Sequence, residues 1–153
     1  MIYNFYDTCS LLMRAANLFD DINEKIIISS VTLQELENIK TSLNKDAEIK
    51  YNARKLLRTL DENSNKYEVV IFKESMLEPI QQADLPINDD MRILACAIWQ
   101  NNHSPAMDDL HFITNDLAFK QIANLFFGNE MIHSVSEENI EEYLGYKEIL
   151  LND

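Results

Sequence analysis

The hydrophobic positions of this chain alternate between short β-type runs and longer segments with helical spacing. Runs of apolar β-branched and aromatic residues predict strands at residues 2–6, 26–28, 69–72, 111–114 and 131–135. Apolar residues at helical spacing predict helices at residues 10–19, 31–43, 46–60, 89–100, 116–127 and 136–144. Residues 74–86 contain Pro79 and Pro86, which indicate a loop with at most one helical turn.

This order of elements predicts an α/β fold. Strands that alternate with helices form a mostly parallel central sheet, and the helices cover both of its faces. We therefore expect a three-layer α/β/α sandwich. The 153 residues include only two glycines and three prolines and show no linker, so we expect a single domain over residues 1–153. Ligands of such sheets bind outside the carboxyl ends of the strands.

Acidic residues occur where strands give way to helices or where helices begin. They are Asp7, Glu35, Asp90 and Asp116. A parallel sheet would bring these carboxylates to one edge, where mutual repulsion calls for a cation. Oxygen ligands suit hard ions, so we expect Mg²⁺ or Mn²⁺, and cutting of phosphodiesters is the use that such a site favours. The scarcity of glycine argues against a phosphate-binding loop at these junctions.

Each acid also has a purely structural explanation. Thr32 and Glu35 have the spacing of a helix capping box. Asp7 and Asp116 could be N-caps, and Asp89 with Asp90 could stabilise a helix N-terminus. Any one of these explanations is sufficient for its residue. An acid at all four positions is what favours a metal site.

Composition narrows the range of protein classes. The net charge of −13 argues against membranes and general polyanion binding, and no apolar run approaches the roughly 20 residues of a membrane span. The two cysteines form no CxxC motif, and the three histidines lack zinc-like spacing. The N-terminus does not resemble a signal peptide. We therefore expect a cytoplasmic protein.

Positive charge is concentrated in one segment. Six of the 13 basic residues lie between positions 40 and 58, against two acidic residues there. Arg54, Lys55 and Arg58 could bind the phosphate backbone of a nucleic acid, or could form an ordinary solvated helix face. Arg92, two residues after Asp90, could meet a phosphate or neutralise the acidic residues.

Four segments together resemble the motifs of PIN domains, which are metal-dependent ribonucleases. They are residues 6–12 (YDTCSLL), 31–36 (VTLQEL), 90–95 (DMRILA) and 113–116 (ITND). Residues 36–40 (LENIK), 53–58 (ARKLLR) and 143–148 (YLGYKE) resemble most closely the PIN domains that are joined to PhoH-type ATPases. Met91 departs from the asparagine that is common at this position in that group.

The resemblance implies a role for each matching residue. Asp7, Asp90 and Asp116 would hold the metal directly or through water, and Glu35 would bind the metal or orient a water molecule. Asp90 is preferred to Asp89 because it lies three residues before Ile93 of the third motif. Three further residues could support this site by hydrogen bonds or could have core or turn roles instead, namely Thr8, Thr114 and Asn115.

These implications lead us to expect a Mg²⁺- or Mn²⁺-dependent endoribonuclease that cuts single-stranded RNA. Two alternatives stay open. One is a non-catalytic PIN module that contacts RNA or protein. The other is a phosphoryl-transfer enzyme of the haloacid-dehalogenase or receiver type with Asp7 as nucleophile, although Cys9 replaces the second aspartate of the former. A homo-oligomer and a longer chain with a C-terminal ATPase domain are also compatible with the sequence.

Overall fold

The computed structural model describes residues 1–135, and its centre is a five-stranded parallel sheet of order β3-β2-β1-β4-β5. The strands are β1 (Ile2–Tyr6), β2 (Lys25–Ser29), β3 (Tyr67–Val70), β4 (Asp109–Ile113) and β5 (Ile132–His133). The α-helices are α1 (Thr8–Arg14), α2 (Ser30–Thr41), α3 (Ala47–Glu62), α4 (Glu78–Gln82), α5 (Asp89–His103) and α6 (Leu117–Ala123). Short 3-10 helices are η1 (Ala15–Asn17), η2 (Glu74–Leu77) and η3 (Asn129–Met131).

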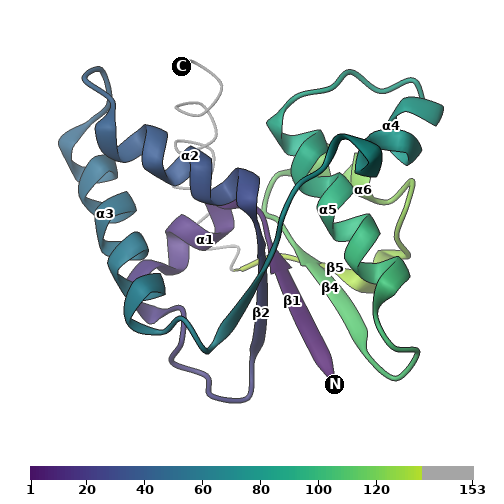
Figure 1. Ribbon diagram of the computed structural model, residues 1–153, viewed down its shortest axis with the longest axis horizontal. Helices are drawn as coiled ribbons and strands as arrows, with labels where there is room; N and C mark the ends of the chain where they lie inside the picture. The colour runs from purple at the N-terminus through teal and green to yellow at the C-terminus, as the bar shows by residue number, and fades with distance from the viewer. Residues whose placement is uncertain (136–153) are drawn as a thin grey trace.

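The sheet separates two layers of helices, which confirms the predicted α/β/α fold. Figure 1 shows α1, α2 and α3 on one side of the sheet and α4, α5 and α6 on the other. Successive strand residues point to opposite faces. Thus Phe5 and Phe112 pack in the core with α4–α6, whereas Tyr6 and Ile113 pack in the core with α1–α3.

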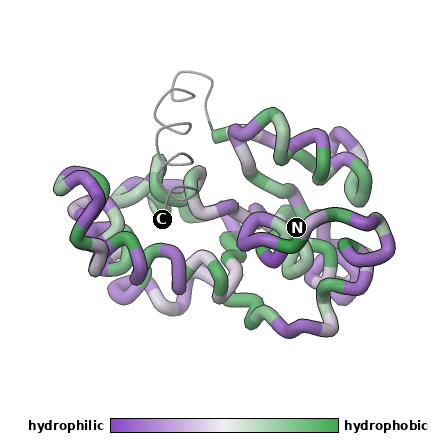
Figure 2. Tube along the Cα trace, turned by 90° about the horizontal axis from the view of Figure 1, so that it is seen from above, coloured by the Kyte–Doolittle hydropathy of each residue, from purple (hydrophilic) through white to green (hydrophobic). Residues whose placement is uncertain are grey.

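The helices present one apolar face to the sheet, as the sequence pattern predicts. Along α3, Ala53, Leu56 and Leu60 are buried, while Arg54 and Arg58 are exposed. This spacing of three and four residues keeps the apolar positions on one side of the helix. Figure 2 shows hydrophobic and hydrophilic residues in alternation along the helices.

The first predicted helix is shorter than expected. It begins at Thr8 and ends at Arg14, because Ala15 has φ of 41°, a conformation that an α-helix does not tolerate. The chain continues as η1, and Leu18 still reaches the core, where it is fully buried. The apolar spacing of residues 10–19 therefore reports burial correctly but not an unbroken helix.

The third strand is shifted toward the N-terminus from its predicted position. It spans Tyr67–Val70, and Ile71 is 66% exposed. Beyond the sheet edge the backbone N–H of Phe72 donates to Oγ of Ser30 at 2.9 Å, so the chain has left the strand ladder. The apolar run of residues 69–72 extends past the sheet, and apolarity alone could not locate the end of the strand.

Several other boundaries differ, mostly by a few residues. The segment 74–86 contains η2 and α4 rather than one turn, and α6 ends at Ala123 instead of continuing to residue 127. The predicted acidic helix at 136–144 and the residues 143–148 lie outside the described residues. Within residues 1–135, no helix combines the length and the apolarity that crossing a membrane requires.

Candidate metal-dependent active site

The order of the strands creates a switch point between β1 and β4. The chain passes from β1 to β2 on one side and later returns to place β4 on the other side of β1. Helix α1 then covers one face of the sheet and α6 covers the other, so the carboxyl ends of β1 and β4 are left open between them. Open parallel sheets bind their ligands at such a point.

Two of the predicted acids flank this switch point. Asp7 directly follows β1, and its backbone N–H donates to the carbonyl oxygen of Ile113, the last residue of β4, at 3.1 Å. Asp116 lies three residues after Ile113. Parallel pairing of Tyr6 with Ile113 therefore brings residues more than 100 positions apart in the sequence to the same edge.

Both residues cap the helices that follow them. Oδ1 of Asp7 accepts the backbone N–H of Ser10 at 2.9 Å, and Oδ1 of Asp116 accepts those of Ala118 at 3.0 Å and Phe119 at 3.3 Å. The capping explanation is therefore correct for these two acids. It does not exclude a ligand role, because a carboxylate accepts several interactions at once. Asp7 is only 3% exposed, so its orientation is well fixed.

Glu35 is held by a chain of hydroxyl groups, and the capping-box explanation for it is wrong. The N-cap of α2 is Ser29, whose Oγ accepts the N–H of Val31 at 3.0 Å, so Thr32 lies inside the helix. Oγ1 of Thr8 lies 2.6 Å from Oε1 of Glu35 and 3.0 Å from Oγ1 of Thr32.

The number of hydroxyl protons decides which group donates in each of these two hydrogen bonds. An ionised carboxylate can only accept, so Thr8 donates its single hydroxyl proton to Glu35, and Thr32 must then donate to Thr8. Glu35 is 8% exposed and the two threonines are buried. Thr8 thus connects the start of α1, next to Asp7, with the second turn of α2.

The third predicted acid lies in the first turn of α5. The N-cap is Asn88, whose Oδ1 accepts the N–H of Met91 at 3.0 Å, so neither Asp89 nor Asp90 is needed as a cap. Asp89 is exposed and pairs with Arg92 at 2.9 Å, whereas Asp90 is half-buried. Arg92 therefore neutralises the neighbour of Asp90.

Helix α5 begins at the same edge of the sheet as the other acids. The last residue of α5 lies six positions before the first residue of β4, and all parallel strands begin at the amino edge of the sheet. The end of α5 therefore lies near the amino edge, and its first turn lies toward the carboxyl edge. It packs against α2, and Oγ of Ser29 donates to Sγ of Cys96 at 3.3 Å between them. The topology thus directs Asp90 to the edge that holds Asp7 and Asp116.

The topology directs the four predicted carboxylates toward this edge, but among residues 1–135 they do not form a closed chelate. Within residues 1–135, no three side chains of the types His, Cys, Asp and Glu are gathered closely enough to hold a metal ion. Like charges repel, and separate partners hold Asp7, Glu35 and Asp116. The donors are all oxygen atoms and two of the carboxylates are buried, so their chemistry fits a hard divalent cation.

Thr114 and Asn115 shape the loop between β4 and α6. Oγ1 of Thr114 accepts the N–H of Asp116 at 3.2 Å, and Oδ1 of Asn115 accepts the N–H of Val135 at 2.7 Å. Both side chains are buried. The bond of Thr114 shapes the turn before Asp116, and the bond of Asn115 ties this loop to the segment after β5.

A small cavity adjoins Asp116 that the sequence did not reveal. Its volume is about 130 Å³. It is lined by Thr114, Asn115, Asp116, Leu117, Lys120, His133 and Ser134. Lys120 and His133 had no motif to mark them, although Lys120 follows Asp116 by one helical turn and could have been found from that spacing.

The predicted RNA-binding residues lie on α3, which Figure 1 shows as the outermost helix of its layer. Helix α3 ends at Glu62, five residues before β3 begins. Arg54 and Arg58 are exposed, and Nζ of Lys55 lies 5.9 Å from the ring centroid of Tyr51. Contact of these residues with RNA stays a prediction.

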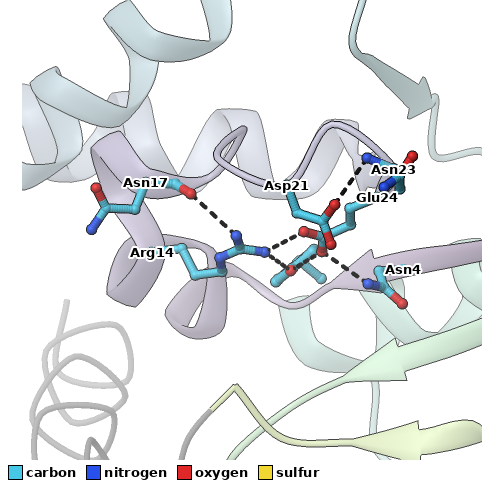
Figure 3. A network of polar contacts seen from close by, with 7 residues as sticks. Asn4, Arg14, Asn17, Asp21, Asn23 and Glu24 are labelled. Carbon is cyan, nitrogen blue, oxygen red and sulfur yellow. Dashed lines mark hydrogen bonds and ion pairs between the residues drawn. The ribbon is translucent and has the colours of Figure 1, made fainter.

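A second polar network lies on the face of the sheet that α1 covers (Figure 3). Glu24 accepts from Arg14 at 2.6 Å, from Asn4 at 2.8 Å and from the hydroxyl of Tyr6. Burial, and then the bond to Glu24, raise the pKa of Tyr6. This network ties the segment before β2 to β1 and α1, so we assign it a structural role.

The fold and the candidate site together define a class of protein: a parallel α/β domain with acidic residues at its switch point. The family profile described as the PIN domain matches residues 5–126, so the chain belongs to the PIN domain family. The chain is similar to the crystal structure of VapBC2 from Rickettsia felis bound to a DNA fragment from their promoter, with 22% identity. The match covers 88% of this chain and 98% of that chain, with a TM-score of 0.51, and it supports the fold. No curated protein matches the chain.

Proposed function

We propose that this PIN domain is a Mg²⁺- or Mn²⁺-dependent endoribonuclease that hydrolyses phosphodiester bonds in single-stranded RNA. The observation that supports the proposal is that Asp7 follows β1 and bonds to Ile113 at the end of β4, three residues before Asp116, while Glu35 is buried and is bonded by Thr8. Membership of the PIN family supports nuclease-type chemistry.

The residues at the edge have distinct tasks in this proposal. Asp7, Glu35, Asp90 and Asp116 would hold the cation. Such an ion lowers the pKa of an attacking water and stabilises charge on the phosphate oxygens. Thr8 orients the carboxylate of Glu35, and the backbone N–H groups of α1 and α6 fix Asp7 and Asp116. Asn115 holds the loop of Asp116 in place.

The test is cleavage of an end-labelled single-stranded RNA with and without Mn²⁺. We expect Asp7→Asn and Asp90→Asn to fold normally and to lose at least about 100-fold in rate, because each removes a charged ligand. Asp89→Asn is the matched control, since Asp89 is adjacent but paired with Arg92 on the surface. Equal activity of Asp89→Asn and Asp90→Asn would contradict the site.

The main competing function is a non-catalytic PIN module. It predicts RNA or protein binding without metal-dependent cleavage, so the same assay separates the two. The VapBC2 structure is a complex on DNA, and a protein partner for this chain is a proposal by analogy that co-purification tests.

For a phosphoryl-transfer enzyme, Asp7 would be the nucleophile, and its 3% exposure and its cap bond disfavour attack.

The finer assignments also remain proposals. The likeness of residues 36–40 and 53–58 to PIN domains joined to PhoH-type ATPases supports that subgroup and an ATPase domain in a longer chain. The coding sequence beyond residue 153 tests this: an in-frame glycine-rich ATP-binding motif supports it and an immediate stop codon contradicts it. We also propose that residues 1–153 form a single domain, which limited proteolysis tests. We propose a cytoplasmic location, which cell fractionation tests, and self-association, which light scattering tests.

A further inference from the structure

The cavity beside Asp116 places a positive charge next to the acidic edge. Lys120 lies on α6 one turn after Asp116, and its backbone N–H donates to the carbonyl oxygen of Asp116 at 2.8 Å. Residues four apart share a helix face, and both side chains line the cavity. Lys120 is half-buried, so its ammonium group is confined to the neighbourhood of the cavity.

Lys120 differs from the other basic residues that follow the predicted motifs. Arg92 pairs with Asp89 at 2.9 Å, and Lys40 pairs with Glu37 at 3.0 Å. In the part of the chain that the structure describes, Lys120 forms no ion pair with another described residue. Its charge is therefore available to an anionic ligand.

Another part of the cavity lining comes from the end of β5. Nε2 of His133 lies 2.8 Å from the carbonyl oxygen of Glu130, so Nε2 carries a proton and donates. The ring of His133 also packs against His111, with ring centroids 4.2 Å apart. Asn115 fixes the following segment through Val135. This part of the lining is therefore held in place by several contacts.

The size of the cavity limits the ligand. A volume of about 130 Å³ corresponds to roughly four water molecules at ~30 Å³ each, which accommodates a phosphate group. The lining supplies hydroxyl, amide and ammonium groups, which bind phosphate, and it also includes the carboxylate of Asp116, whose negative charge the proposed cation would offset. Leu117 is 72% exposed at the same cavity and offers an apolar contact for the attached sugar.

We propose that this cavity is a phosphate subsite, in which Lys120 binds a non-scissile phosphate of the RNA strand. The subsite would hold the backbone next to the bond that is cut and would set the register of the strand across the acidic edge. This inference rests on the proposed ribonuclease function. It adds a binding residue that none of the four sequence motifs contains.

The test uses single-stranded RNA oligonucleotides that carry one neutral methylphosphonate linkage, moved along the strand. Binding is measured by fluorescence anisotropy with Mn²⁺ in the Glu35→Gln background, so that cleavage does not interfere. We expect one linkage position at which neutralisation weakens binding roughly five- to tenfold. In Lys120→Ala that position should lose its effect while the others keep theirs, and Lys120→Arg should retain it.

Lys66→Ala is the matched control, because Lys66 is an exposed lysine just before β3, at the opposite edge of the sheet. The same methylphosphonate pattern in Lys120→Ala and in the parent would overturn the subsite. Cleavage by the wild-type chain is assayed separately. If cleavage occurs but the pattern is unchanged, only the subsite is wrong; if RNA neither binds nor is cleaved, both proposals fail.

Discussion

Thr8 shows how much of the site depends on single hydrogen bonds. It follows Asp7 directly, yet its hydroxyl serves Glu35 on another helix. The sequence could mark Thr8 as a supporting residue through its place in the first motif. It could not reveal that Thr32 hydrogen-bonds to Thr8, because Thr32 and Glu35 also have the spacing of a capping box. The structure rules out that capping box, since the N-cap of α2 is Ser29.

Glu35→Gln separates a catalytic from a structural role at this position. Glutamine still accepts a hydrogen bond from Thr8, so we expect a change of less than about 1 kcal/mol in the free energy of unfolding. If Glu35 holds the metal or a water molecule, the cleavage rate should fall at least about 100-fold. Chemical denaturation and single-turnover cleavage measure the two quantities. Normal cleavage would leave Glu35 as a structural residue only.

Thr8 and Thr32 give a graded companion test. Thr8→Val removes the donor to Glu35 at nearly constant volume, so the carboxylate of Glu35 loses the bond that orients it. We expect the single-turnover cleavage rate to fall roughly tenfold in Thr8→Val, with a smaller fall in Thr32→Val. Thr8→Ser should behave as the wild type. Equal rates in all three variants would show that the hydroxyl groups do not act on the reaction.

His111 makes folding stability depend on pH. Burial, and then the neighbouring His133, lower the pKa of His111, while Asp109 opposes them. A lowered pKa means that the unfolded chain binds the proton more readily than the folded chain. The stabilisation is complete above the ordinary pKa of 6.5 and is lost as the pH falls from there toward the folded value.

We therefore expect the melting temperature to fall between pH 7.5 and pH 5.5, and to fall less in His111→Gln. The cavity beside His111 also presents Arg14, Glu24 and Asp21 to this ring, so their charges must stay constant across the comparison. Thermal melts of both proteins at each pH are the measurement. A steeper fall in His111→Gln would contradict the assigned direction.

At the scale of elements, the sequence located every strand but not every boundary. The centre of β2 is a run of three buried β-branched residues, Ile26, Ile27 and Ile28, and such a run is enough to identify a strand. The break after α1 depends on the backbone of Ala15, whose positive φ has no sequence signal such as glycine. The shift of β3 depends on where the parallel ladder stops, which is decided by pairing with β2.

Helix α3 poses the element-scale question about RNA binding. Its basic face was predicted to contact the RNA backbone, and Arg54 and Arg58 on this face are exposed. We expect replacement of Arg54, Lys55 and Arg58 by alanine to weaken RNA binding for all sequences. The slope of log affinity against log salt should flatten by up to about 2, since each phosphate contributes about 0.7.

Binding titrations at several salt concentrations measure this slope. Stabilisation by Mn²⁺ serves as the control and should be unchanged, because no carboxylate is altered. An unaltered slope in the triple variant would mean that this face of α3 is only solvated. Contacts near Lys120 would then be the better candidate for the RNA path.

At the scale of the whole molecule, the excess of negative charge and the open acidic edge are linked. A chain of net charge −13 repels itself and its proposed substrate, and the repulsion is greatest where acids gather. The absence of a closed carboxylate cluster among residues 1–135 agrees with this electrostatic cost. That Asp7, Glu35, Asp90 and Asp116 act at one edge could be predicted from the sequence because strand order directs them there, and it stays a prediction. Their final spacing depends on the cation, about which sequence carries little information.

Metal binding should therefore appear in the stability of the whole fold. An ion that binds only the folded chain stabilises it by about 2.7 kcal/mol at 100 times its dissociation constant. For a chain of this size that corresponds to a rise of roughly 5–10 °C in melting temperature.

We expect this rise with Mn²⁺ in the wild type and in Asp89→Asn. In Asp7→Asn and Asp90→Asn it should be largely lost, while their metal-free melting temperatures equal or exceed that of the wild type, because a repulsive charge is gone. Thermal melts with Mn²⁺ and with EDTA measure both effects. Equal Mn²⁺ stabilisation of all four proteins would place any bound metal elsewhere, even if the chain cleaves RNA.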